Sequence, residues 1–141
     1  MKKLLRILLL VILVAVTLTA VGCGGNVQEE SEMICEKNSD GYYQITPEDA
    51  RDIMGRESDY VILDVRTQDE YNEVHIPDAV LLPDYEIISR ATEVLPDKDK
   101  LILVYCRSGR RSKNASAELA ALGYSNVYEF GGIIDWPYET E

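Results

Sequence analysis

The sequence predicts an α/β domain with a mainly parallel central sheet of about five strands and helices on both faces. Two observations lead to this prediction. Apolar segments typical of strands alternate along the chain with segments that have helical periodicity, an order that builds parallel sheets. The two longest strand candidates, YVILDV at 60–65 and LILVY at 101–105, are almost continuously apolar. Such runs are typical of strands covered on both faces.

The first helix of this pattern has clear boundary signals. A short strand is expected at 43–45, and Thr46 follows it as an N-cap. Pro47 suits the first helical turn, where a missing N–H costs nothing. Glu48 and Asp49 place negative charge at the positive end of the helix dipole. A helix is therefore expected to begin directly after Thr46.

The alternation continues to the end of the chain. Gly123 has the position of a residue that ends a helix, and the apolar side chains of the segment at 84–95 form one stripe. The expected elements are a strand at 60–65, a strand at 79–83, a helix at 84–95, a strand at 101–105, a helix at 112–123, a strand at 126–130 and a helical turn at 133–136. These segments form one undivided domain at 41–141.

The first 22 residues resemble a secretory signal peptide. Lys2, Lys3 and Arg6 precede an apolar stretch that ends in small residues. The alternative is an uncleaved membrane anchor, since 4–21 spans eighteen residues and a bilayer needs about twenty. In both cases the basic residues stay on the inner side of the membrane, so the remainder of the chain is expected to be exported.

Cys23 follows Ala-Val-Gly directly, and this junction resembles the lipobox of bacterial lipoproteins. The resemblance implies a signal peptide at 1–22, lipidation of Cys23, and anchoring to the extracytoplasmic face of a bacterial membrane. Residues 23–40 are polar and acidic, as expected for a flexible tether. Without the signal peptide the chain carries 11 basic and 25 acidic residues, a net charge of about −14. This charge speaks against a nucleic acid partner.

The loop after the strand at 101–105 brings a thiol into a basic segment. Cys106 stands at the carboxyl end of the strand, where ligands bind in parallel α/β sheets. Gly109 permits the tight curvature that turns successive N–H groups inward. The helix expected from Ser112 would add its positive end. Four cationic side chains fall in the same segment: Arg107, Arg110, Arg111 and Lys113.

These surroundings favour the charged form of Cys106. A helix N-terminus and nearby cations lower the pKa of a thiol from about 8.5, so a nucleophilic thiolate is expected at neutral pH. The only histidine, His75, is distant in the sequence and is expected to stabilise a turn, while Trp136 is expected to cover the core. A disulfide from Cys35 to Cys106 is an open alternative, but it would remove the thiol.

The loop CRSGRRS at 106–112 resembles the active-site loop of single-domain rhodaneses, with the pattern Cys-x-x-Gly-x-Arg-Ser/Thr. Two more segments agree with this family: ILDVRTQDEYNEVHIPDAVLLP at 62–83 and VYEFGGIIDW at 127–136. The chain departs from the family at Val74 and Asp78, where glycines are usual, so a different turn geometry is expected there. The resemblance covers nearly all of 41–136 and implies the rhodanese fold.

The resemblance also implies a sulfurtransferase. Cys106 would take a sulfur atom from thiosulfate or a similar anion as a persulfide, and a thiol or cyanide would then accept it. The resemblance implies that Arg111 is the second catalytic residue. It also implies a reaction that needs neither a cofactor nor a metal ion. The expected substrate-binding residues are Arg107, Ser108, Gly109, Arg110, Ser112 and, at the end of the strand at 60–65, Asp64.

Two other functions remain open. Cysteine-based phosphatases and arsenate reductases share the architecture, but their pattern is Cys-x5-Arg, and the sixth position after Cys106 is Ser112. Here the arginine comes one residue earlier, at Arg111. A binding module that keeps the fold without catalysis is the other alternative, and the intact cysteine and basic loop argue against it.

Overall fold

The computed structural model describes residues 36–141, which contain a five-stranded sheet in the order β1-β5-β4-β2-β3. All four strand pairs are parallel. The strands are β1 (Tyr43–Gln44), β2 (Tyr60–Asp64), β3 (Val80–Leu81), β4 (Leu101–Cys106) and β5 (Asn126–Gly132). The helices are α2 (Pro47–Arg56), α3 (Gln68–Glu73), α4 (Ile87–Val94) and α5 (Arg110–Ala121), with 3-10 turns η1 (Asp84–Glu86) and η2 (Ile133–Asp135). The predicted parallel α/β fold is confirmed.

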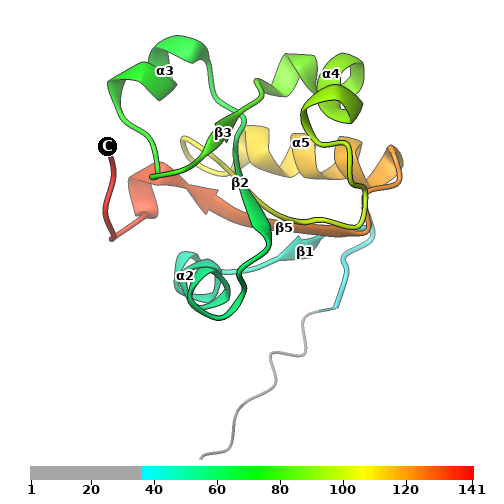
Figure 1. Ribbon diagram of the computed structural model, residues 1–141, viewed down its shortest axis with the longest axis horizontal. Helices are drawn as coiled ribbons and strands as arrows, with labels where there is room; N and C mark the ends of the chain where they lie inside the picture. Colours follow the sequence, from blue (N-terminus) through cyan, green and yellow to red (C-terminus); the bar gives the residue numbers. More distant parts are fainter. Residues whose placement is uncertain (1–35) are drawn as a thin grey trace, which may run out of the picture. The chain divides into compact units, whose positions relative to one another are not determined.

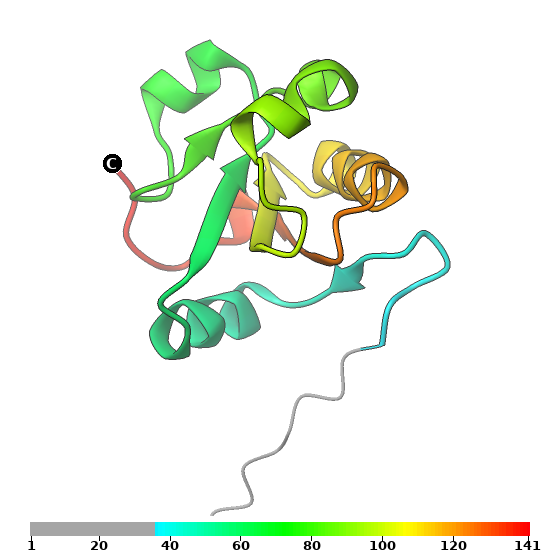
Figure 2. The ribbon, with the colours of Figure 1, turned by 45° about the vertical axis from the view of Figure 1, so that its right-hand side comes forward.

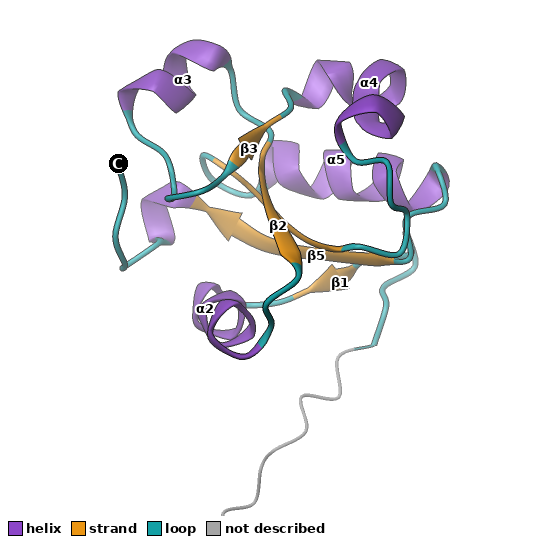
Figure 3. Ribbon diagram, in the orientation of Figure 1, coloured by secondary structure: helices purple, strands orange, loops and turns teal. Residues whose placement is uncertain are grey.

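Helices cover both faces of the sheet. Figure 1 shows α4 and α5 on one side of the strands and α2 on the other, and the turned view in Figure 2 keeps this separation. Figure 3 shows the strands between these two helical layers. The core is accordingly divided into two clusters, one with the buried side chains of α4 and α5 and one with those of α2.

The central strands β2 and β4 supply both clusters in alternation. Leu63 of β2 and Val104 of β4 belong to the cluster under α4 and α5. Ile62 and Tyr105 belong to the cluster under α2. Successive side chains of a strand point to opposite faces, so a strand between two covered faces has no polar side. This alternation places the Cys106 side chain on the face of α4 and α5.

The helix boundaries follow local signals, and they differ from prediction in several places, among them the segment at 84–95, which is the 3-10 turn η1 followed by α4. Thr46 caps α2 in a full capping box, as expected. The six-residue α3 was not predicted, because none of its residues is buried and no apolar stripe marks it. The helix after Cys106 begins at Arg110 and not at Ser112, because Gly109 with φ of 92° takes the N-cap position. The N-terminal end of α5 therefore lies closer to the thiol than predicted.

Asp78 occupies a left-handed turn, at a position where the family that the sequence resembles usually has glycine. Its φ of 63° is the only positive value of a non-glycine residue within the described range. Aspartate tolerates this conformation better than most side chains. The turn therefore keeps a left-handed residue without glycine. Val74 has a φ of −165°, an extended conformation open to any residue, so the second departure changes no special geometry.

Predictions for the N-terminal segment fall mostly on residues that are not described. The signal peptide at 1–22, Cys23 and Cys35 lie outside the described residues. From the predicted tether, Lys37 is described, and its Nζ donates to the carbonyl of Ser125 at 2.7 Å. Within residues 36–141, no helix is long and apolar enough to cross a membrane.

Gly132 allows β5 to touch the loop that follows β4. A Cβ built on Gly132 would lie 2.2 Å from the carbonyl oxygen of Arg107 and 2.5 Å from the Cα of Ser108. Its φ of −125° is open to any residue, so the requirement for glycine is one of space. This contact fixes the position of the loop against the sheet.

We predict that Gly132→Ala lowers the free energy of unfolding by about 1–3 kcal/mol, because the new methyl group meets backbone atoms that cannot move aside. Urea denaturation followed by circular dichroism measures the difference. Gly55→Ala is the matched control: its Cβ meets nothing within 4 Å, and it lies in the last turn of α2. That variant is expected to be as stable as the wild type or up to about 1 kcal/mol more stable. Equal stabilities of the two variants would contradict the prediction.

Candidate active site

The Cys106 thiol is free and lies at the carboxyl end of β4. The side chain is buried, with a relative exposure of 1%. The backbone N–H of Gly109 donates to its sulfur at 3.1 Å, and the Ser112 hydroxyl lies 3.4 Å from the sulfur. The loop between β4 and α5 therefore curves around the sulfur, as the glycine and the helix start predict.

Hydrogen bonds to the sulfur outweigh its burial. Burial is the largest single influence and raises the pKa of Cys106, but the Ser112 side chain and the backbone N–H groups of Ser112, Ser108 and Gly109 together lower it. The net result is a pKa below the ordinary value of the thiol. A lowered pKa makes the thiol easier to ionise, and the thiolate is the nucleophilic form of cysteine. N–H donors of this kind can also stabilise negative charge on the sulfur.

Arg111 lies beside the thiol but is held by an acidic side chain. Its two terminal nitrogens each donate to a carboxylate oxygen of Glu70 on α3, both at 2.7 Å. This bidentate pair lowers the pKa of Glu70 to about 2 and raises the pKa of Arg111, to which the charge of Cys106 also contributes. Glu70 therefore fixes the orientation of the guanidinium next to the sulfur.

The other residues of the loop are of two kinds, those buried next to the sulfur and those exposed to solvent. Gly109 and Ser112 are buried against the sulfur, whereas Arg107, Ser108 and Arg110 are exposed. Both arginines are accessible to solvent. Substrate binding by these residues stays a prediction.

Asp64 does not face the thiol pocket as a free carboxylate. It is fully buried at the end of β2, and its oxygens accept hydrogen bonds from the Arg66 guanidinium and from the Tyr105 hydroxyl at 2.7 Å. Arg66 also donates to the carbonyl of Val74, and Tyr105 accepts from the N–H of Ile76. These contacts favour a structural role that ties β2, β4 and the segment before β3 together.

Ser112 connects the thiol to a second acid, Glu129 of β5. The Ser112 Oγ lies 2.7 Å from Oε1 of Glu129, which also accepts the N–H of Gly131 at 2.8 Å. Glu129 is 1% exposed, so its carboxylate is buried behind the loop. The thiol, the hydroxyl and this carboxylate form a continuous chain of polar groups.

Sequence reasoning missed Glu70 and Glu129, although each leaves a signal. Glu70 stands three residues after Thr67, and the two form the capping box of α3. Glu129 is a charged residue inside an otherwise apolar strand segment, VYEF. The capping pattern predicts α3, and a charge inside a buried strand indicates a polar partner. Neither signal identifies Arg111 or Ser112 as that partner.

The contacts of His75 and Trp136 are those of residues that stabilise the fold, as expected. The backbone of His75 exchanges two hydrogen bonds of 2.8 Å with Glu141, and its ring stacks on Tyr71. Trp136 is 7% exposed and packs in the cluster under α2. Both residues hold the C-terminal segment to the domain.

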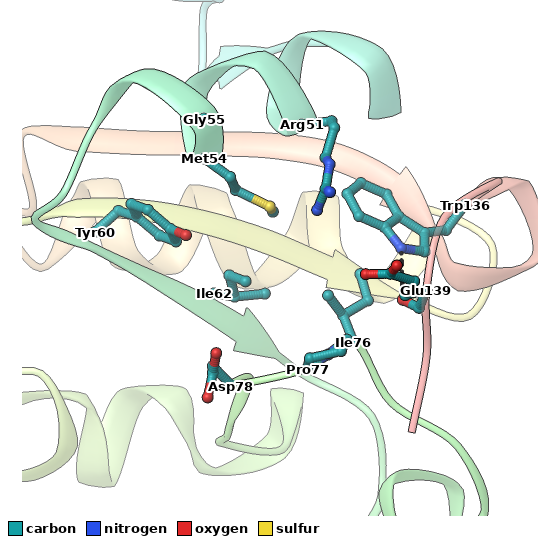
Figure 4. Close-up of a pocket in the computed structure, with 10 residues that line it drawn as sticks. All are labelled: Arg51, Met54, Gly55, Tyr60, Ile62, Ile76, Pro77, Asp78, Trp136 and Glu139. Carbon is teal, nitrogen blue, oxygen red and sulfur yellow. Dashed lines mark hydrogen bonds between the residues drawn. The ribbon is translucent and has the colours of Figure 1, made fainter.

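A cavity of about 340 Å³ lies on the α2 side of the sheet, away from Cys106. Figure 4 shows Arg51 of α2 and Trp136 and Glu139 of the C-terminal segment around it, with Asp78 at its edge. Its lining mixes one cation with two carboxylates, so it favours no single charge of ligand. The chemistry described above lies on the opposite face, in the loop after β4.

Comparison with protein families gives one match. The family model described as "Rhodanese-like domain" matches residues 46–137. Curated relatives include the thiosulfate sulfurtransferase PspE of Escherichia coli (strain K12), which is 36% identical over 73 residues, 52% of this chain and 70% of the relative. The thiosulfate sulfurtransferase GlpE of Pseudomonas syringae pv. syringae (strain B728a) is 36% identical over 104 residues, 70% of this chain and 94% of the relative.

Solved structures agree with these relatives. The structure titled "rhodanese with anions from E. coli" has a TM-score of 0.55 and 32% identity, covering 58% of this chain and 96% of its own. The rhodanese-like domain of a protein from Anabaena sp. has a TM-score of 0.64 and 29% identity, covering 70% of this chain and 77% of its own. The fold, the loop around Cys106 and the match over 46–137 together show that this chain belongs to the family of rhodanese-like domains, with sulfurtransferases among its relatives.

Proposed function

We propose that this protein is a thiosulfate sulfurtransferase that carries sulfur as a persulfide on Cys106. The observation that carries the proposal is the position of the Cys106 sulfur, buried and 3.1 Å from the Gly109 nitrogen, in a loop that lowers the pKa of the thiol. The names of the relatives PspE and GlpE support thiosulfate as the donor.

The first half of the reaction transfers one sulfur atom to the enzyme. The Cys106 thiolate attacks the outer sulfur of thiosulfate, and a new sulfur–sulfur bond forms. The bond between the two sulfur atoms of thiosulfate breaks, and sulfite leaves with the electron pair. The product on the enzyme is a persulfide anion, so the total charge is unchanged. Backbone N–H groups of the loop would stabilise the outer sulfur.

The second half returns the enzyme to its starting state. A thiolate or cyanide attacks the outer sulfur of the persulfide and leaves as a persulfide or as thiocyanate. The bond between the two sulfur atoms on the enzyme breaks, and the Cys106 thiolate is regenerated. No cofactor enters either step, because every electron pair comes from sulfur or the acceptor.

We propose that the pair of Arg111 and Glu70 orients the incoming anion. Glu70 holds both terminal nitrogens of the guanidinium, and the charge of Cys106 raises the pKa of Arg111, so the guanidinium lies within electrostatic reach of the sulfur. Arg107 and Arg110 would draw the anion to the mouth of the loop. Ser108, Gly109 and Ser112 would bind it through backbone and hydroxyl donors.

We further propose that the mature chain is a lipoprotein on the extracytoplasmic face of a bacterial membrane. The support is the sequence before Cys23: a basic start, an apolar stretch and small residues at the junction. Sulfur transfer would then take place outside the cytoplasm, with a small anion as donor and a thiol or cyanide as acceptor.

Cys106→Ser is predicted to abolish thiosulfate-dependent thiocyanate formation, because a hydroxyl of nearly the same size cannot form a persulfide. Colorimetric detection of thiocyanate measures the turnover, and the unfolding midpoint shows whether the fold is kept. Cys35→Ser serves as the matched control and should leave turnover unchanged. Residual turnover of more than a few per cent in Cys106→Ser would refute the proposal.

Arg111→Lys should lower kcat/KM for thiosulfate at least tenfold, a loss of about 1.4 kcal/mol in transition-state stabilisation. A lysine cannot reproduce the bidentate contact with Glu70, so its charge is no longer held in place. Steady-state kinetics at varied thiosulfate measure the effect. The matched control is Arg90→Lys on α4, which removes an exposed arginine that pairs with Glu86. Equal kinetics in the two variants would show that Arg111 has no special role.

Cys23→Ala is predicted to release the protein from the membrane fraction or to leave it as an unprocessed precursor. The reason is that a lipoprotein is anchored only through the acyl chains on this cysteine. Fractionation of cells and the apparent mass of the protein provide the measurement. Normal processing together with unaltered membrane attachment would contradict lipidation at Cys23.

A further inference from the structure

Glu129 is a buried acid that the sulfur-transfer steps do not use. Its side chain is 1% exposed, and its Oε1 accepts hydrogen bonds from Ser112 Oγ and the Gly131 N–H. Within residues 36–141 it forms no ion pair with lysine or arginine. A buried carboxylate without a cation is costly. Within residues 36–141, the Ser112 hydroxyl donates to this carboxylate and is also a neighbour of the Cys106 sulfur.

Ser112 has a single hydroxyl hydrogen for several acceptors. Its Oγ lies 2.7 Å from Oε1 of Glu129, 3.1 Å from the carbonyl of Gly109 and 3.3 Å from the carbonyl of Gly131. Of these three acceptors, the Glu129 carboxylate is the nearest and the only one that can carry a charge. It therefore holds the hydroxyl hydrogen of Ser112 most strongly. The oxygen then presents its lone pairs to Cys106, whose sulfur lies 3.4 Å away as a donor.

Ionisation of Cys106 reverses the hydrogen-bonding role that its sulfur requires of the Ser112 hydroxyl. The neutral thiol donates its hydrogen to Ser112, whereas the thiolate needs a donor. Ser112 can supply that donor only by turning its hydrogen away from Glu129, and the carboxylate then loses a hydrogen bond in a buried site. The charge on Glu129 therefore opposes the charge on Cys106 through the hydroxyl between them.

We propose that Glu129 is a positioning residue that sets the ionisation of Cys106 by competing with its sulfur for the hydroxyl hydrogen of Ser112. Three groups carry the inference: the sulfur on β4, the hydroxyl on α5 and the carboxylate on β5. Glu129 offsets part of the lowering of the Cys106 pKa that the backbone N–H groups cause. It thereby keeps the thiol less acidic than the loop alone would make it.

Other ionisable groups also surround Glu129. Tyr42 lies close enough for the charge of Glu129 to raise its pKa, after burial as the main cause. Lys113 and Asp135 line the same hollow of about 260 Å³ as Glu129. None of these three donates a hydrogen bond to the Glu129 carboxylate or to the Cys106 sulfur. Ser112 is thus the side chain that joins the two acids.

The test is the pH dependence of Cys106 alkylation by iodoacetamide, followed by mass spectrometry. Glu129→Gln removes the charge but keeps the size and an oxygen that accepts from Gly131. Because the neutral amide holds the Ser112 hydrogen less strongly, the midpoint of alkylation should move about one pH unit lower. An unchanged midpoint in this variant overturns the proposal.

Asp135→Asn is the matched control, since it removes an acid that lines the same hollow and is not a hydrogen-bond partner of the Ser112 hydroxyl. Its alkylation midpoint should equal that of the wild type, and a shift as large as that of Glu129→Gln would show a general charge effect. Comparing Glu129→Gln with and without Ser112→Ala tests the path through the hydroxyl. The shift should fall by at least half without the hydroxyl, and a full shift would exclude Ser112 as the link.

Glu129→Asp provides a second variant if the glutamine variant fails to fold. It keeps the charge but withdraws the carboxylate from Ser112 by one methylene group, so the midpoint should again move to lower pH. An unchanged midpoint would contradict the proposal. The inference concerns a residue of the sulfur-transfer site, but alkylation needs no sulfur donor. A midpoint shift without thiosulfate turnover would therefore uphold Glu129 while refuting the proposed function.

Discussion

The hydrogen bond from the Gly109 N–H to the Cys106 sulfur is the contact on which the site depends. It requires a loop that turns back on itself within three residues, which the φ of 92° at Gly109 allows. It also requires that the loop rest against β5, where Gly132 leaves no room for a side chain. The parallel sheet holds these two segments side by side, so the hydrogen bonding of the Cys106 thiol depends on the pairing of β4 with β5.

Acidic side chains near the sulfur offset part of the positive charge of the loop, which the sequence of the loop alone does not indicate. Glu70 binds both terminal nitrogens of Arg111 and is ionised at neutral pH, because its pKa is lowered to about 2. Glu129 adds a buried acid behind Ser112. The lowered pKa of Cys106 therefore rests mainly on hydrogen bonds from the loop. Backbone donors have fixed positions, and they suit a sulfur atom whose charge must be stabilised both as thiolate and as persulfide.

The fold was predictable where one local pattern decides the structure. The apolar runs that became β2 and β4 and the cap at Thr46 needed no distant contact, and neither did the placement of Cys106 at a strand end. Contacts between distant residues were not predictable. Glu70 is 41 residues from Arg111, and Glu129 is 17 residues from Ser112. The apolar side chains at 84–95 were predicted to form one stripe, but Ile88 in this segment is 63% exposed, whereas Ile87 and Ala91 are buried.

The most direct test of the central claim is the intact mass of the purified protein after incubation with thiosulfate and removal of the excess. The account predicts a gain of one sulfur atom, located on the peptide that contains Cys106 and lost again on addition of cyanide, with thiocyanate as the product. A protein that gains no sulfur, or that carries the added sulfur on Cys35, would contradict the assignment of Cys106 as the sulfur carrier.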